Sequence, residues 1–161
     1  MQTYSRSRQW PCLTEPFVFY RSLVVNLDPS AFLANPDLIL ALRKQSTAVL
    51  CPEDRVLFRQ GDDPGGLYIL LKGKVTLTMA SPDGKPILSA HAAEGSLLGL
   101  PGLIGNEPYT LTAIAHRGAE LSFVTGAQFT SLMQSDPLLS LTILQVLAAE
   151  VRSARNAILH R

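Results

Sequence analysis

The chain has 161 residues, of which 47% are hydrophobic and 17% charged, and its formal net charge is +1. These values exclude an intrinsically disordered or collagen-like chain, and the length is that of one domain with a sizeable core. The small net charge gives no indication of nucleic-acid or membrane binding. Cys12 and Cys51 are too few for a disulfide scaffold and lack the spacing of a zinc site.

The organisation of the chain predicts three parts. Residues 1–28 form a lead-in, residues 29–135 a β-rich body with flanking helices, and residues 136–161 a long helix. The polar start of the lead-in is unlike a secretory signal, and the longest apolar runs are far short of the ~20 residues that span a membrane. We therefore expect a cytoplasmic protein without a membrane partner.

Two short helices are predicted before the strands. The segment from Pro29 to Ala34 is long enough for one or two helical turns. Asn35 is a suitable N-cap and Pro36 suits the first helical position, so a second helix is expected from there to Arg43.

Residues 47–125 show short apolar or alternating runs that are separated by glycine- and proline-rich turns. The expected strands are Thr47–Leu50, Val56–Arg59, Leu67–Leu71, Lys74–Met79, Ile87–His91, Leu97–Leu100, Leu111–Ala115 and Glu120–Val124. Many short strands of this kind indicate a mainly β fold, which is a sandwich, a barrel or a jelly roll.

Two helices are predicted after the strands, a short one over Ala127–Met133 and a long one that follows Asp136 and Pro137. The apolar residues of the long helix have the 3-4-3-4 spacing of a coiled-coil seam, formed by Leu144, Leu147, Val151, Ala154 and Ile158. The stripe either packs on the β-rich body or pairs with a second copy of the chain. We favour a homodimer, because a helix of roughly 24 residues is ~36 Å long and exceeds what the body needs.

Signatures of catalysis, metal binding and nucleic-acid binding are missing from the sequence. It contains no G-x-S-x-G, Walker A or H-E-x-x-H motif, and His91, His116 and His160 are scattered. No helix-turn-helix pattern follows the long helix, and the longest basic run is Arg43-Lys44. We expect a protein that is not an enzyme, holds no metal and does not bind nucleic acid through this chain.

A glycine-rich corner is predicted between Glu94 and Gly105. A strand there ends at a glycine, and a short helix can begin at Pro101. The unpaired backbone amides of such a helix start can bind an anion, or the corner is only a turn.

The segments Val56–Gly61 and Leu67–Val75 combine a glycine, an aromatic-aliphatic strand and then Gly-x-Val. With Glu94–Leu100 and the last strands before Phe129, they resemble the cyclic nucleotide-binding domain family over about residues 29–161. The resemblance implies an antiparallel β jelly roll with N-terminal helices and a long C-terminal dimerisation helix. It also implies the sensor domain of a Crp/Fnr-type regulator, here without a DNA-binding helix-turn-helix domain.

The resemblance places the ligand site in a phosphate-binding cassette. In this family a glycine is followed by a glutamate that binds the ribose, and an arginine further on neutralises the cyclic phosphate. Here Gly99 matches the glycine, Leu100 stands at the glutamate, and Tyr109 or Thr110 stands at the arginine. Losing two charge-assisted hydrogen bonds costs roughly 3–6 kcal/mol, or ~10²–10⁴ in affinity.

The remaining cassette positions are Pro101 and Gly102, and the resemblance implies that Ala154 and Arg155 on the long helix face the base. The expected ligand is a cyclic nucleotide (cAMP or cGMP) bound weakly, another small anionic ligand, or none. Two functions follow from the resemblance. The chain is a regulatory sensor module that acts on a protein effector, or it is a degenerate domain that serves as a dimerisation or docking scaffold.

Overall fold

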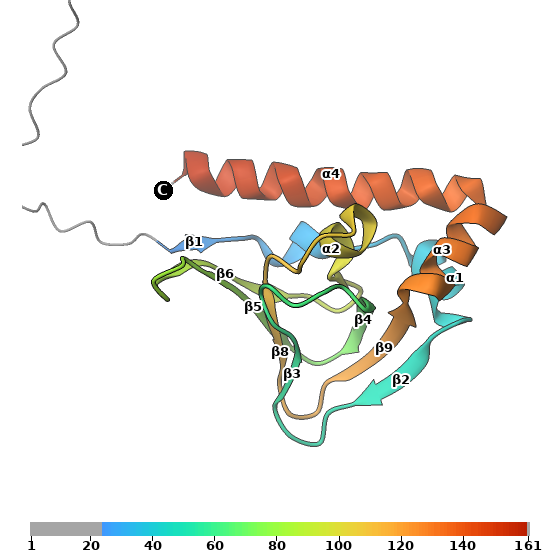
Figure 1. Cartoon of the computed structure of the whole chain (residues 1–161), viewed down its shortest axis with the longest axis horizontal. Coiled ribbons are helices and arrows are strands. Elements are labelled where there is room, and N and C mark those ends of the chain that lie inside the picture. The colour runs from blue at the N-terminus through green and yellow to red at the C-terminus, as the bar shows by residue number, and fades with distance from the viewer. Residues whose placement is uncertain (1–23, 161) are drawn as a thin grey trace, which may run out of the picture.

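The computed structural model describes residues 24–160, which form two β-sheets flanked by helices (Figure 1). The strands are β1 (Val25–Asn26), β2 (Thr47–Leu50), β3 (Arg55–Phe58), β4 (Gly66–Lys72), β5 (Val75–Ala80), β6 (Pro86–Ala92), β7 (Leu97–Leu98), β8 (Thr112–Ala115) and β9 (Glu120–Thr125). The helices are the 3-10 turn η1 (Pro29–Phe32), α1 (Pro36–Arg43), α2 (Leu100–Gly105), α3 (Gly126–Ser135) and α4 (Pro137–Leu159).

The strand orders of the two sheets are β1-β6-β5-β8-β3 and β2-β9-β4-β7. Every strand pairing within residues 24–160 is antiparallel except the short one between β1 and β6. Strands that are distant in the sequence lie side by side, as in a jelly roll. The predicted fold class, a jelly roll with N-terminal helices and a long C-terminal helix, is confirmed.

Two apolar clusters hold these elements together. The first fills the inside of the jelly roll and includes Phe32, Phe58, Leu77 and Leu121. The second lies between the other face of β4 and the helices, and its members include Leu38, Leu67, Leu100, Phe129, Ile143 and Val146. The alternation along β4 explains the division, because successive side chains of a strand point to opposite faces.

The strand predicted over Leu97–Leu100 is too long. The strand ends at Leu98 because Gly99 has φ +90°, a left-handed conformation that glycine adopts without strain. Helix α2 then begins at Leu100, with Pro101 in its first turn as expected. The sequence did not indicate β1, which lies at the end of the predicted lead-in; most of that lead-in falls outside the described residues.

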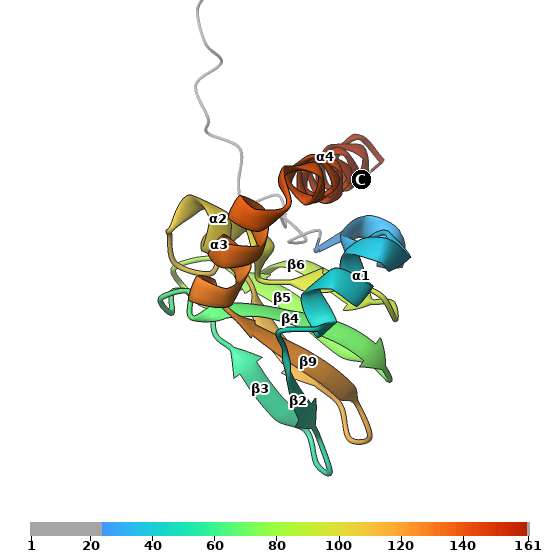
Figure 2. The ribbon, with the colours of Figure 1, turned by 90° about the vertical axis from the view of Figure 1, so that its right-hand side faces the viewer.

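Helix α4 lies along the outside of the jelly roll and contacts η1, α1, α3 and β1 (Figures 1 and 2). Asp136 precedes it as expected, but its side chain makes no capping hydrogen bond. Ile143 and Val146 are buried against the body, whereas Leu144 and Val151 are exposed. The apolar stripe therefore packs only in part on its own domain.

By length and composition alone, α4 is also apolar enough to cross a membrane, although the uninterrupted apolar runs of the sequence are short. One such helix is weak evidence for a membrane span, because packed helices of globular domains meet the same test. The contacts of Ile143 and Val146 with the jelly roll account for part of this apolar character.

Candidate functional site

The corner at Gly99 brings two distant parts of the backbone together. A Cβ atom added at Gly99 would lie 2.8 Å from Cε1 of Tyr109 and 3.4 Å from the carbonyl oxygen of Gly66. The left-handed φ and this close approach both require glycine at the position. The corner thus fixes where α2 starts relative to the segment that carries Tyr109.

We expect Gly99→Ala to cost about 1–2 kcal/mol more in unfolding free energy than Gly84→Ala. Both glycines have positive φ, +90° and +84°, but an added Cβ at Gly84 meets no atom within 4 Å. The matched pair therefore separates the clash with Tyr109 from the conformational cost. Urea denaturation of both variants measures the difference. Equal losses of unfolding free energy would contradict the close approach of Gly99 to Tyr109.

Tyr109 is a buried structural residue, with only 6% of its surface exposed. Its ring stacks on Phe58 with a centroid distance of 4.1 Å. Its hydroxyl donates a hydrogen bond of 2.6 Å to the carbonyl oxygen of Gly66, and the Gly66 N–H donates back to the hydroxyl at 3.2 Å. Of the two residues predicted for the arginine position, Tyr109 and Thr110, the first therefore has its polar atom committed to the backbone.

Leu100, at the predicted glutamate position, is completely buried in the second apolar cluster. It does not line the pocket that its neighbours Gly99, Pro101 and Gly102 line. The structure thus places five of the six predicted cassette residues around one cavity, and it places Leu100 on the other side of the backbone.

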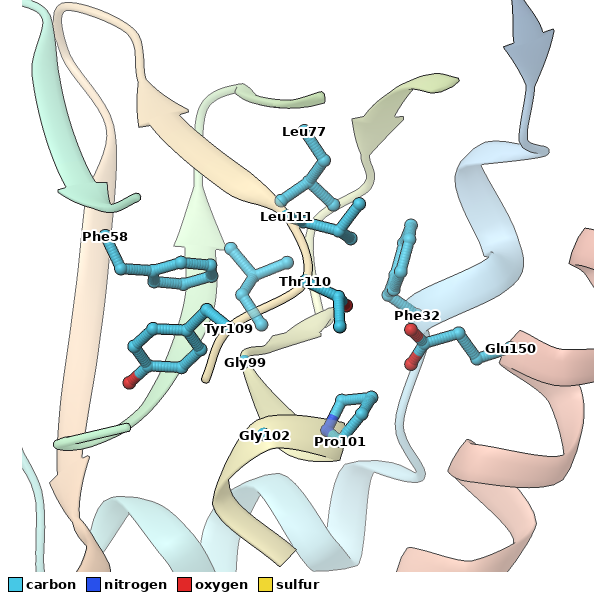
Figure 3. A pocket seen from close by; sticks show the side chains of 11 residues that line it. Phe32, Phe58, Leu77, Gly99, Pro101, Gly102, Tyr109, Thr110, Leu111 and Glu150 are labelled. Atoms are coloured by element: carbon cyan, nitrogen blue, oxygen red, sulfur yellow. The ribbon is translucent and has the colours of Figure 1, made fainter. Parts of the chain in front are cut away.

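The cavity lies between the cassette corner, the inside of the jelly roll and α4 (Figure 3). Its volume of about 20 Å³ is enough for roughly one water molecule. Most of its wall is apolar or glycine, and the lining residues are Phe32, Phe58, Leu77, Leu98, Gly99, Pro101, Gly102, Tyr109, Thr110, Leu111 and Glu150. A ligand the size of a nucleotide fits only after the surrounding elements move apart.

Glu150 is the single contribution of α4 to this wall. Burial of its carboxyl group raises the pKa to about 7. The sequence analysis does not indicate this residue. The spacing along the helix could have indicated it. Val146, Glu150 and Ala154 are four residues apart and therefore share one helix face.

The two helix positions predicted to face a base lie elsewhere. Ala154 packs against the cluster inside the jelly roll and does not line the cavity. Arg155 is exposed and lines a groove on the outer face of α4, together with Leu147, Ala148, Val151, Arg152, Asn156 and Leu159. The structure therefore does not bring Arg155 to the cassette.

Among residues 24–160, side chains that could hold a metal do not gather near the cavity. Within the described part of the chain, no group of three or more His, Cys, Asp or Glu side chains is placed to bind a metal ion. The site as built offers ring and aliphatic surface, the Thr110 hydroxyl and one carboxyl group.

The family model of the cyclic nucleotide-binding domain matches residues 48–136, more than half of the chain. The chain belongs to this family. The match includes the strands from β2 to β9, the cassette corner and α3, and it precedes α4. The fold is that of this domain family.

Similar sequences and structures of individual proteins support the assignment to this family. The CRP-like cAMP-activated global transcriptional regulator of Mycobacterium tuberculosis is 27% identical over 121 residues, which cover 75% of this chain and 54% of that protein. The catabolite activator protein of Thermus thermophilus has a TM-score of 0.67 at 26% identity, covering 81% of this chain and 62% of that structure.

A second kind of relative is much larger. Lysophospholipase nte1 of Neurospora crassa is 30% identical over 99 residues, which cover 62% of this chain but 6% of that protein. The chain thus spans about half of the bacterial regulator and a small part of the lysophospholipase. The similarity concerns the regulatory domain type and not the activity of either whole protein.

Proposed function

We propose that this chain is a non-enzymatic regulatory module in which a ligand between the cassette corner and α4 controls the position of α4. One observation carries the proposal: a single cavity is lined by Gly99 and Pro101 from the corner, by Thr110 from the segment before β8, and by Glu150 from α4. A ligand that enlarges the cavity must change the contact between α4 and the jelly roll. Its differential affinity for the two positions of α4 would shift their populations.

We further propose that the ligand is not a typical cyclic nucleotide, although the Mycobacterium tuberculosis relative is named as cAMP-activated. Among the described residues that line the cavity there is no lysine, arginine or histidine to neutralise a cyclic phosphate. The carboxyl group of Glu150 would repel the phosphate when ionised. The hydroxyl of Tyr109 is already bonded to Gly66.

A titration with cAMP, cGMP and cyclic di-GMP tests this proposal by thermal shift. A ligand at about 100 times its dissociation constant stabilises a fold by ~2.7 kcal/mol, which is several degrees for a domain of this size. We expect no saturable shift at micromolar concentrations of any of the three. A saturable micromolar shift would contradict the proposal, and hydrogen exchange of the α4 amides would then show whether the helix moves.

A second candidate function, a homodimerisation scaffold, is favoured by the outer face of α4. Leu141, Leu144, Val151 and Ile158 are each about half exposed or more, with exposed fractions of 59%, 58%, 49% and 56%. Leu144, Val151 and Ile158 are seven residues apart, which is the repeat of a coiled coil. A second copy of α4 in the same orientation would cover this face.

Replacing Leu144 with Asp should weaken such a dimer by at least about a hundred-fold, since the carboxylate would lose its hydration in an apolar interface. Leu40→Asp is the matched control, because Leu40 is 57% exposed and lies on α1. Analytical ultracentrifugation of the full chain measures the dissociation constants. Equal effects of the two substitutions would contradict dimerisation through α4.

A further inference from the structure

We propose that the cavity at Glu150 selects a small ligand that carries a protonated amine on an apolar body. This inference rests on the proposed function, because it takes the cavity between the cassette corner and α4 to be a ligand site. It adds the charge and the chemical class of the ligand, which differ from those of an anionic nucleotide.

The first argument is the isolation of the Glu150 carboxyl group. Within residues 24–160 it has neither a hydrogen-bond partner nor a salt bridge. Its neighbours one turn away on α4 are Val146, Leu147, Ser153 and Ala154, none of which is charged. Arg152 and Arg155 lie in the groove on the outer face of the helix. No positive charge of α4 therefore shares the cavity with the carboxyl group.

The other walls of the cavity supply no counter-charge either. Apart from Glu150, Tyr109 is the only titratable residue among those that line it, and its hydroxyl is bonded to Gly66. The helix η1 contributes Phe32, β5 contributes Leu77, and the segment before β8 contributes Thr110 and Leu111. Burial raises the pKa of Glu150 to about 7, as expected of a carboxyl group without a cationic partner.

The second argument is the arrangement of the groups around the carboxyl. Figure 3 shows the Glu150 carboxyl and the Thr110 side chain directed to the same space, beside the ring of Phe32. A primary ammonium group has three N–H donors, and a carboxylate and a hydroxyl oxygen both accept hydrogen bonds. An aromatic face also attracts a cation. The aliphatic side chains of Leu77 and Leu111 would contact an apolar body.

The third argument compares ligand charges. An anionic ligand would lie close to a carboxylate in a poorly solvated space, where repulsion is stronger than in water. A neutral ligand would leave the partly buried carboxylate without a partner, which keeps its desolvation cost. A cation removes that cost, so the same cavity favours an amine over an alcohol of equal shape.

The small volume links this recognition to α4. A cavity of about 20 Å³ holds roughly one water molecule, so a larger ligand must displace part of the lining, to which α4 contributes Glu150. Glu150 is the α4 residue that the ligand would contact, and an ion pair there would fix a new helix position. Binding of the amine and displacement of α4 are therefore one event.

A matched set of probes tests the inference on the full chain. Isothermal titration at pH 8 compares 2-phenylethylamine, 2-phenylethanol and phenylacetate, which are respectively cationic, neutral and anionic. We expect the amine to bind at least ten-fold more tightly than the alcohol, and phenylacetate to bind more weakly than both. In the Glu150→Gln variant the affinity for the amine should fall to that for the alcohol. Glu120 is an exposed carboxylate on β9, so the Glu120→Gln variant should keep the preference for the amine.

Three outcomes would overturn the inference, and they differ in what they say about the proposed function. If none of the probes binds to the unmodified chain, the cavity is not a ligand site and the proposed function fails with it. If the alcohol binds as tightly as the amine, the ligand site stands and the charge assignment fails. If Glu150→Gln keeps the preference for the amine, a different group recognises the cation.

Discussion

Replacing Glu150 with Gln should raise the free energy of unfolding by about 3 kcal/mol at pH 8 and change it little at pH 4. The reason is the difference between the ordinary pKa of 4.5 and the pKa of about 7 that burial imposes in the folded chain. Between these two pH values the folded state binds more protons than the unfolded state. Stability contributed by the protonated group is complete below pH 4.5 and is lost as the pH rises to about 7.

Thermal denaturation of the two proteins between pH 4 and pH 8 measures this effect. For a domain of this size about 3 kcal/mol corresponds to roughly 6–12 °C in melting temperature. Glu120→Gln is again the control, since it removes an exposed carboxylate and should leave the pH dependence in place. The same pH dependence in Glu150→Gln as in the unmodified chain would show that the carboxyl group is solvated in the folded state.

Gly66→Ala should reduce the free energy of unfolding by about 2–4 kcal/mol. Gly66 begins β4 and pairs with Thr125 of β9. An added Cβ would collide with the carbonyl oxygen of Val124 and would lie 2.8 Å from the ring of Phe123. Because a backbone oxygen in a sheet cannot rotate away, the two strands would have to separate at this point.

The preceding residue provides a matched control for this substitution. A Cβ added at Gly65 meets no heavy atom within 4 Å, so Gly65→Ala should stay within about 0.5 kcal/mol or stabilise slightly. Urea denaturation of both variants gives the comparison. The backbone of Gly66 also holds the Tyr109 hydroxyl, so Gly66→Ala should loosen the cassette segment as well. Equal stabilities of the two variants would contradict the close packing of β4 on β9.

The elements with local signals could be predicted from the sequence. Asn35 caps α1 by accepting a hydrogen bond of 2.8 Å from the backbone N–H of Asp37, as its residue type predicts. The eight expected strands all exist with small shifts of their ends, because turn residues mark their limits. The two-residue strand β1 has no such signal, since it exists only through its pairing with β6.

The candidate site was harder to predict because side-chain direction after a corner is a tertiary property. The sequence indicated that Gly99, Pro101 and Gly102 form the corner, and the structure places all three at the cavity. It could not indicate that Leu100 turns to the second apolar cluster or that Glu150 faces the cavity. Both depend on how α2 and α4 are rotated against the jelly roll, which local patterns do not determine.

The small volume of the cavity between the cassette corner and α4 has a kinetic consequence. With room for about one water molecule, the site should admit a larger ligand only after its lining, including Glu150 of α4, has moved. The observed association rate of any such ligand should therefore stop rising with concentration and level off at the opening rate of α4. The time constant of that plateau would report how fast the module answers a signal, independently of how tightly the signal molecule is held.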